Sequence, residues 1–413
     1  MGERTKAMVV SLGGTPAPII FSLNQSKPEY ICFFVSRDTK GIMDEVISSL
    51  NIRPKHHDWI LTPNPESLSD SYSALRKKLP ELFEKWEIDP QEVCVDYTGG
   101  TKTMSVALTL ATIEESCCYS YVGGIERSKG GVGVVVDGTE RMWFLDNPWD
   151  NIAHAEKREA SILFNKARYA SAADVLEKCV RRVSRDQQPF FRALREMVTG
   201  YDLWDRFRHA DAKRQLHKCS DVLTALSSEK KEIKEIVKRL ERNLQFLERL
   251  LSGSKPSSLY GHDLLANAKR RAELEKKFDD AVARLYRAIE VLAQSELKET
   301  YGIETSNVKE ETIPFNIREE YLLKYKDRLD GKIKVPLLGS YRLLTELGSD
   351  LGKNFFGVYE KEIRPLLNIR NNSILAHGFN PVDQKTFERL FGALLKFSGT
   401  GEEDLPVFPV LKV

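Results

Sequence analysis

The chain has 413 residues and a net charge of +2, with 30% of its residues charged and 41% hydrophobic. This composition excludes the disordered and collagen-like classes, and no run of eighteen apolar residues is present, so we expect no membrane span. The charge is unevenly divided: residues 1–150 carry 15 basic and 21 acidic side chains (net −6), and the rest carry 47 and 39 (net +8). An acidic front and a basic back indicate separate functions.

Short apolar runs in the first third of the chain predict buried β-strands. They occupy residues 7–12, 30–36, 59–62 and 93–97, with helical patterns at 70–86 and 104–115. This alternation predicts an α/β domain over residues 1–150 with a mostly parallel, doubly wound sheet. Apolar runs at 132–136 and 142–145 flank Asp137-Gly138, a hairpin signal that predicts an antiparallel edge.

From about residue 151 onward the strand signals disappear. Residues 228–251 place Ile and Leu at steps of three and four, which predicts an amphipathic helix, and residues 252–258 have the composition of a linker. We therefore expect an all-α region, with a helical linker or bundle domain at 151–255 and a second helical domain at 256–413. Residues 300–340 look irregular, and we find no internal repeat.

The N-terminal residues and the cysteines both bear on the cellular location of the protein. The first residues lack a signal peptide's cleavage pattern. The six cysteines form no CxxC pair, which favours free thiols in a reducing compartment. We expect a cytoplasmic protein.

Three loops that follow predicted strands carry residues suited to phosphate binding. Residues 96–104 (Asp-Tyr-Thr-Gly-Gly-Thr-Lys-Thr-Met) join a strand to a helix, where backbone N–H groups and the helix dipole favour an anion. The spacing matches neither the Walker A loop nor G-x-G-x-x-G, and a purely structural β-turn-α loop is the alternative. The candidate ligand-binding residues are Ser11, Gly13, Gly14, Thr15, Ser36, Arg37, Thr98, Gly99, Gly100, Thr101, Lys102 and Met104.

The segment from Asp96 to Lys102, together with Met104, resembles the hallmark motif of CARF domains, the CRISPR-associated Rossmann-fold domains. The loop at 11–16 is similar to their first ligand loop. The resemblance covers about residues 1–150. It implies a Rossmann-like fold and binding of a cyclic oligoadenylate second messenger across a homodimer interface.

A second constellation lies near the C-terminus, in the sequence Asn368-Ile-Arg370-Asn371-Asn372-Ser-Ile-Leu-Ala-His377-Gly378. If this stretch is one helix, Arg370 and His377 lie on the same face about 10 Å apart along the axis, and Gly378 caps the helix. Histidine transfers protons near neutral pH, and arginine binds phosphoryl oxygens. A structural or capping role for His377 is the alternative. Arg284 and Arg287 are further candidates for RNA contact, with an ion-paired helix face as the alternative.

The spacing R-x(6)-H, with Asn directly after Arg, resembles the signature of HEPN ribonucleases. That resemblance implies a metal-independent endoribonuclease in which two protomers form one composite site. The ribose 2′-OH then attacks the adjacent phosphate, with Arg370, His377, Asn371 and Asn372 as the catalytic residues.

Together the two resemblances predict a type III CRISPR ancillary effector: a homodimeric endoribonuclease that cyclic oligoadenylate activates. The alternative is a cyclic oligoadenylate sensor whose helical domain is not an active nuclease. Besides this activator and RNA, we expect no cofactor, no metal and no membrane partner.

Overall fold

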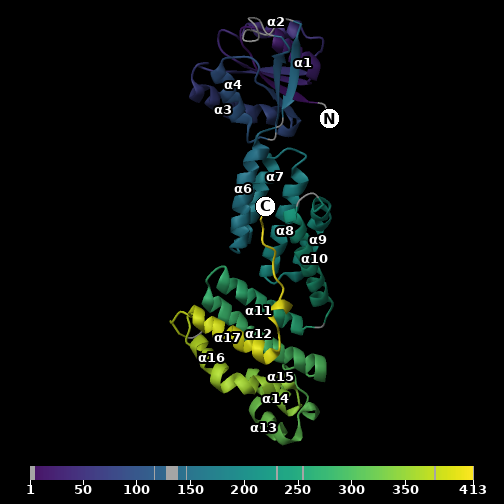
Figure 1. Ribbon diagram of the computed structural model, residues 1–413, viewed down its shortest axis with the longest axis vertical. Coiled ribbons are helices and arrows are strands. Elements are labelled where there is room, and N and C mark those ends of the chain that lie inside the picture. The colour runs from purple at the N-terminus through teal and green to yellow at the C-terminus, as the bar shows by residue number, and fades with distance from the viewer. Residues whose placement is uncertain are drawn as a thin grey trace. The chain divides into compact units, whose positions relative to one another are not determined.

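The computed structural model describes residues 5–115, 117–126, 138–145, 147–228, 231–253, 255–375 and 378–412 (Figure 1). The chain separates into two compact units. Unit 1 comprises Met1–Arg158 and Asp174–Arg192, and unit 2 comprises Glu159–Ala173 and Ala193–Val413. Within the described ranges, no helix has the length and apolar character needed to cross a membrane.

Among the described residues, a six-stranded sheet forms the centre of unit 1. Its strands lie in the order β3-β2-β1-β4-β5-β6, and every neighbouring pair is parallel except β5 and β6, which are antiparallel. The predicted α/β fold with a mostly parallel sheet and an antiparallel edge is therefore confirmed. The strand bounds are β1 (Ala7–Ser11), β2 (Tyr30–Val35), β3 (His56–Leu61), β4 (Val93–Asp96), β5 (Cys118–Gly124) and β6 (Glu140–Leu145).

The antiparallel edge differs in detail from the prediction. β6 pairs with β5, with Trp143 opposite Tyr121. The apolar run at 132–136, which was expected to form the other strand of the hairpin, lies outside the described residues. The sequence analysis does not predict β5, because this strand ends in Gly123 and Gly124, residues that are typical of turns.

Helices cover both faces of the sheet. Alternate residues of β1 point to opposite faces: Met8 and Val10 pack in one buried cluster with α1 and α2, and Ala7 and Val9 pack in another with α3 and α4. Figure 1 shows α3 and α4 on the side of the strands opposite α1. This two-sided burial explains why the central strands are continuous apolar runs. The helices are α1 (Ala17–Ser26), α2 (Ile42–Ser48), α3 (Leu68–Trp86) and α4 (Lys102–Thr112).

After the sheet the described chain is helical, as predicted. The amphipathic pattern at 228–251 forms α10, whose Ile233, Ile236, Leu240 and Leu247 are buried. The helices are α6 (Trp149–Asn165), α7 (Tyr169–Arg182), α8 (Gln188–Asp205), α9 (His209–Leu226) and α10 (Lys231–Ser252).

The expectation of no internal repeat is wrong. The turns α6–α7 and α8–α9 share one geometry: Arg168 and Arg208 donate their N–H to the carbonyls of Leu163 and Leu203, each at 2.9 Å. Each turn has one non-glycine residue with positive φ, Ala167 (56°) or Phe207 (60°). The repeat is hard to see because its aromatic positions differ in residue type. Identical pairs include Ala153/Ala193, Glu156/Glu196, Leu163/Leu203, Arg168/Arg208, Ala170/Ala210, Ala172/Ala212, Leu176/Leu216, Lys178/Lys218 and Cys179/Cys219.

The C-terminal helices share one core centred on α12, which contacts α11, α14 and α17. The segment at 300–340, expected to be irregular, contains the short helix α13, with Ile317 and Tyr321 buried. The elements are α11 (Ser258–Glu273), α12 (Phe278–Tyr301), α13 (Phe315–Tyr325), α14 (Leu337–Glu346), α15 (Asp350–Val358), a π-helix (Tyr359–Ile363), α16 (Arg364–Asn371) and α17 (Gln384–Ser398).

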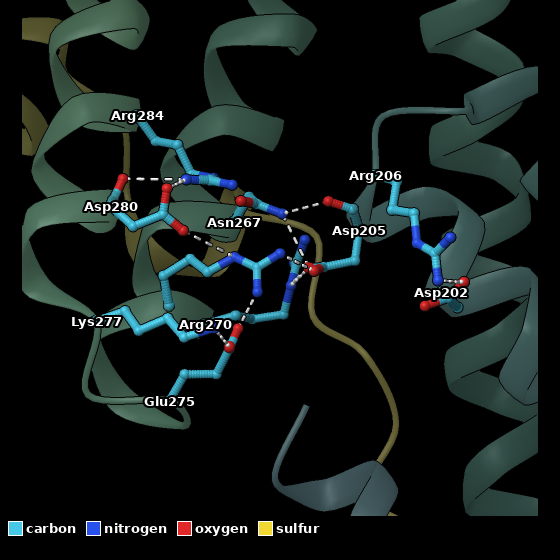
Figure 2. Close-up of polar contacts among 10 residues, drawn as sticks. Asp202, Asp205, Arg206, Asn267, Arg270, Glu275, Lys277, Asp280 and Arg284 are labelled. Atoms are coloured by element: carbon cyan, nitrogen blue, oxygen red, sulfur yellow. Dashed lines mark hydrogen bonds and ion pairs between the residues drawn. The ribbon is translucent and has the colours of Figure 1, made fainter. Parts of the chain in front are cut away.

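A buried ion network fixes the end of α8 to α11. The carboxylate of Asp205 accepts hydrogen bonds from Asn267 Nδ2 at 2.9 Å and from Arg270 Nε at 3.1 Å, and it also pairs with Arg271. Figure 2 shows Asp205 facing Asn267 and Arg270. Because Asp205 and Arg270 are buried, removing one partner would leave an uncompensated charge in the core. The network therefore fixes the position of α11 against the C-terminal end of α8.

Candidate ligand site and candidate nuclease segment

The strand order of the sheet reverses at β1, which lies between β2 and β4. In open α/β sheets, ligands bind outside the carboxyl ends of the strands at such a switch point. The loops at 11–16 and 96–102 follow β1 and β4 directly. The structure thus brings the two predicted ligand loops together at this edge.

Glycines let these two loops touch through their backbones. A Cβ on Gly99 would overlap the carbonyl oxygen of Ser11, and one on Gly13 would lie 2.7 Å from the amide nitrogen of Gly100. Gly100 also has a φ of +79°, in the region that favours glycine. Gly14, in contrast, faces open space. Three of the four predicted glycines are therefore required by the loop geometry itself.

A buried carboxylate at the end of β4 sets the shape of the second loop. Asp96 is 0% exposed. One of its oxygens accepts a hydrogen bond from Ser22 Oγ and, at 3.1 Å, from Ser120 Oγ, and the other accepts the N–H of Thr98 at 2.9 Å. Asp96, Ser22 and Ser120 were not among the predicted site residues. An acidic residue closing an apolar strand was the one signal that could have indicated this role.

Several predicted phosphate-binding hydroxyls already have partners within the protein. Thr98 Oγ1 accepts the N–H of Val122 at 2.8 Å. Thr101 Oγ1 donates to the carbonyl of Pro65 at 2.7 Å and caps α4 through the N–H of Met104. Ser11 Oγ donates to the carbonyl of Gly99 at 2.6 Å. These side chains hold the loops in place, so a ligand would meet mainly the backbone and the exposed residues.

The exposed members of the predicted set are Gly14, Thr15, Arg37 and Lys102. Lys102 and Arg37 bring positive charge to this edge of an otherwise acidic domain. The remaining two predicted residues are buried. Ser36 is hydrogen-bonded to Thr39, and Met104, 1% exposed, packs in the core beneath the loop.

An aromatic pair lies beside the second loop. The rings of Tyr97 and Tyr121 stack with centroids 5.7 Å apart. Burial, with Tyr121 and Asp96 nearby, raises the pKa of Tyr97. The phenol therefore stays neutral near pH 7 and adds no negative charge next to the loop.

The second predicted constellation does not form one helix. α16 ends at Asn371, and residues 372–375 form a turn. The expectation that Arg370 and His377 lie on a single helix face, with Gly378 as its C-cap, is therefore wrong. The side chain of Arg370 and the whole of His377 lie outside the described residues.

Backbone contacts explain why the helix stops. Ser373 is buried and forms a bridge with Asn380, and the N–H of Gly378 donates to the carbonyl of Ser373 at 3.1 Å. A Cβ on Gly378 would overlap the backbone of Asn372. The chain thus folds back on itself between 372 and 380, and the exposed Asn371 and Asn372 lie where α16 enters this loop.

A π-helix, Tyr359–Ile363, directly precedes α16. Such segments are rare and often occur at functional sites. The surface near the loop is apolar: Ile369, Ile374 and Leu375 are exposed, and Phe379 is 91% exposed. Among the residues that the structure describes, no group of three or more His, Cys, Asp or Glu side chains is arranged to hold a metal ion.

The fold and the sites define a class of protein in which a Rossmann-type α/β domain precedes a helical domain. Residues 152–247 match the family model of the Csm6 6H domain, and residues 249–399 match that of the Csm6 HEPN domain. The two matches together cover more than half of the chain. The chain belongs to the CARF–HEPN effectors of type III CRISPR systems.

The chain is similar to solved structures of other proteins. Csm6 of Enterococcus italicus bound to cyclic hexa-2′-fluoro-hexa-dAMP is similar over 95% of this chain and 94% of that chain, with a TM-score of 0.54 and 11% identity. Can2 from Sulfobacillus thermosulfidooxidans in complex with cyclic tetra-adenylate covers 49% of this chain and 67% of that chain, with a TM-score of 0.25 and 13% identity. No curated protein matches the chain. The first likeness concerns the fold over nearly the full length.

Proposed function

We propose that the chain is an endoribonuclease that cuts single-stranded RNA when cyclic oligoadenylate binds to its α/β domain. The observation that carries this proposal is the match of residues 249–399 to the Csm6 HEPN domain, because this segment contains Arg370 and His377 in the R-x(6)-H spacing. The ligand class is supported by the two glycine-interlocked loops at the switch point. The similar Csm6 structure is described as bound to a cyclic hexanucleotide analogue.

The proposed reaction needs only groups that the chain and its substrate supply. The ribose 2′-OH attacks the adjacent phosphorus, and the 5′-oxygen of the next nucleotide leaves, which produces a 2′,3′-cyclic phosphate. His377 transfers the protons, and Arg370 binds the phosphate oxygens. Asn371 or Asn372 orients these two side chains. DNA lacks the 2′-OH and would not be cut. Metal independence is part of the proposal.

In the proposal, the active form is a homodimer that brings two Arg–His sets together. The exposed apolar side chains beside the candidate nuclease segment, Ile369, Ile374, Leu375 and Phe379, support this. Clustered apolar exposure is unusual on a soluble surface and marks interaction sites. A second copy of the chain would cover these side chains.

Ligand binding and RNA cleavage would occur at different places, so their coupling would be allosteric. The ligand phosphates would meet Lys102, Arg37, Thr15 and the N–H of Gly14, which are exposed at the switch point. A ligand shared by two protomers would favour one dimer arrangement over another.

The test is RNA cleavage with and without cyclic tetra- and hexa-adenylate, in EDTA. We expect single-stranded RNA to be cut only with ligand, DNA to stay intact, and the products to carry 2′,3′-cyclic phosphates. Arg370→Ala and His377→Ala should abolish cleavage. Ligand binding without any cleavage by the wild-type protein would reject the nuclease and favour the alternative, a sensor without nuclease activity.

A further inference from the structure

A cavity in unit 2 has the features of a nucleotide site. It has a volume of about 460 Å³ and lies where the start of α9 meets α11 and α12; Figure 1 draws α9 in teal and α11 and α12 in green. An adjoining cavity of about 280 Å³ shares three of its residues, Lys255, Pro256 and Gln294. We call the first cavity the junction groove; it is lined by Phe207, His209, Lys255, Pro256, Tyr260, Leu264, Arg287, Val291 and Gln294.

Aromatic rings form one side of the junction groove. His209 meets both Phe207 (centroids 5.9 Å apart, 74°) and Tyr260 (5.5 Å, 83°) edge to face. The His209 ring is fixed in place, because its Nε2 lies 2.7 Å from Oδ2 of the buried Asp263, whose other oxygen accepts the indole N–H of Trp204 at 2.8 Å. Phe207 and Tyr260 are half-buried. Exposed ring surface of this kind stacks on nucleobases irrespective of sequence.

The internal repeat shows that the backbone of the α8–α9 turn does not require a phenylalanine at position 207. At the matching turn, α6–α7, the left-handed position is Ala167 (φ 56°), whereas the α8–α9 turn has Phe207 (φ 60°). The smaller side chain therefore satisfies the same backbone. The positive φ belongs to the helix-ending turn itself, since Ala167 shares it, and the aromatic side chain is what distinguishes the α8–α9 turn.

The charges of the junction groove suit a phosphate. The nine described lining residues include the cations Lys255 and Arg287 and no carboxylate, and the partner of Arg287, Glu290, lies outside the lining. Lys255 Nζ lies 5.4 Å from the Tyr260 ring centroid. By contrast, the cavity beneath the C-terminal segment is lined by Lys269 and Arg270 but also by Glu273 and Glu402, so its charges balance.

An amide completes the set of groups that a nucleotide needs. Arg287 donates from Nη2 to Gln294 Oε1 at 3.3 Å and pairs with Glu290 at 2.8 Å. Because the Gln294 oxygen accepts from Arg287, the amide meets a base edge as a donor, through its NH₂ group. Stacking surface, a donor amide and two cations thus line one cavity of nucleotide size.

The groove lies along the helix that also supports the candidate nuclease segment. At the start of α12, Asp279 accepts the N–H of Val382 at 3.2 Å, just beyond the loop at 372–380. Arg287 and Gln294 follow 8 and 15 residues later on the same helix. At 1.5 Å per residue, this is about 12 to 23 Å along the helix axis. An RNA strand cut at the loop can cover this distance within a few nucleotides.

We infer that the junction groove binds one nucleotide of the single-stranded RNA substrate, away from the bond that is cut. The inference rests on the proposed function for the cleavage itself, but the binding is separable from it. Phe207 and Tyr260 stack on the base, Gln294 contacts its edge, and Arg287 and Lys255 bind the adjoining phosphate. RNA long enough to reach the groove then binds more tightly than a dinucleotide.

The experiment compares Phe207→Ala and Arg287→Gln with Lys353→Gln, an exposed cation on α15 that pairs with Asp350. Phe207→Ala is chosen because the repeat accommodates alanine at that turn, and thermal unfolding checks that all variants fold. In full-length protein carrying His377→Ala, which keeps RNA intact, fluorescence anisotropy measures binding of a 12-nucleotide RNA and of AMP. In otherwise wild-type protein, KM and kcat are measured for the same RNA and for a dinucleotide.

We expect Phe207→Ala and Arg287→Gln to weaken binding of the long RNA, and to raise its KM, by about tenfold each. They should leave kcat and dinucleotide cleavage unchanged, and Lys353→Gln should match wild type. Equal binding of the long RNA by all variants would overturn the inference. It would also be overturned if Phe207→Ala and Arg287→Gln weakened the binding of AMP but left the binding of the long RNA unchanged. If wild-type protein cuts no RNA at all, the binding series still tests the groove independently.

Discussion

Gly99→Ala tests whether the two loops at the switch point must touch through their backbones. A Cβ at this position would overlap the carbonyl oxygen of Ser11 and lie 3.1 Å from the amide nitrogen of Gly13. Neither atom belongs to a flexible side chain, so the loops must separate. Such overpacking destabilises a protein by about 1–3 kcal/mol. Separation also moves the N–H groups that we propose to face the ligand.

The matched control is Gly14→Ala, where nothing lies within 4 Å of the added Cβ. Urea unfolding of the full chain measures stability, and calorimetric titration with cyclic tetra- and hexa-adenylate measures affinity. We expect Gly99→Ala to lower the midpoint of the transition assigned to the α/β domain. Its ligand affinity should fall at least tenfold, which corresponds to about 1.4 kcal/mol. Gly14→Ala should unfold within about 0.5 kcal/mol of wild type. Identical midpoints for the two variants would refute the interlock.

Three further substitutions test other parts of the structure. Asp205→Asn should destabilise the helical unit by about 3–5 kcal/mol, because it leaves buried arginines uncompensated. The control, Asp202→Asn, breaks the more exposed pair with Arg206 shown in Figure 2 and should cost about 1 kcal/mol or less. Equal urea midpoints for the two variants would contradict this. Asp96→Ala removes the acceptor for Thr98 and should weaken ligand binding in the same titration, with a loss of about 1–3 kcal/mol in stability. Burial lowers the pKa of His262 below its ordinary 6.5, so the stability that neutral His262 contributes is present above pH 6.5 and is lost on acidification. His262→Gln should therefore flatten the fall in unfolding free energy between pH 7 and 5. An unchanged slope would show that other groups cause the fall.

The sequence predicted those features of the fold that depend on local pattern. The apolar runs at 7–12 and 30–36 became β1 and β2 because both faces of these strands are covered, which makes the runs continuous. The Ile and Leu spacing of α10 likewise defined a helix with one buried face. The two ligand loops were found because glycine, threonine and lysine mark strand-to-helix turns even in a single sequence.

What the sequence missed depends on contacts between distant residues. Asp96 owes its role to Ser22 and Ser120, which are 74 and 24 residues away. The helix expected through 370–377 ends at Asn371, because Ser373 bridges to Asn380 and the chain turns back there. A prediction based on helix periodicity does not include such tertiary contacts, and it therefore placed the end of the helix too late.

The central claim is that a ligand at the switch-point loops activates RNA cleavage in the helical domain. The most direct measurement is the initial rate of RNA cleavage against cyclic oligoadenylate concentration, for wild type and for Lys102→Ala. Lys102 is exposed beside the loops and belongs to a different compact unit from the nuclease segment. The account predicts that Lys102→Ala shifts the activation curve to higher ligand concentration and reaches the same maximal rate. An unshifted curve, or cleavage that does not depend on ligand, would contradict it.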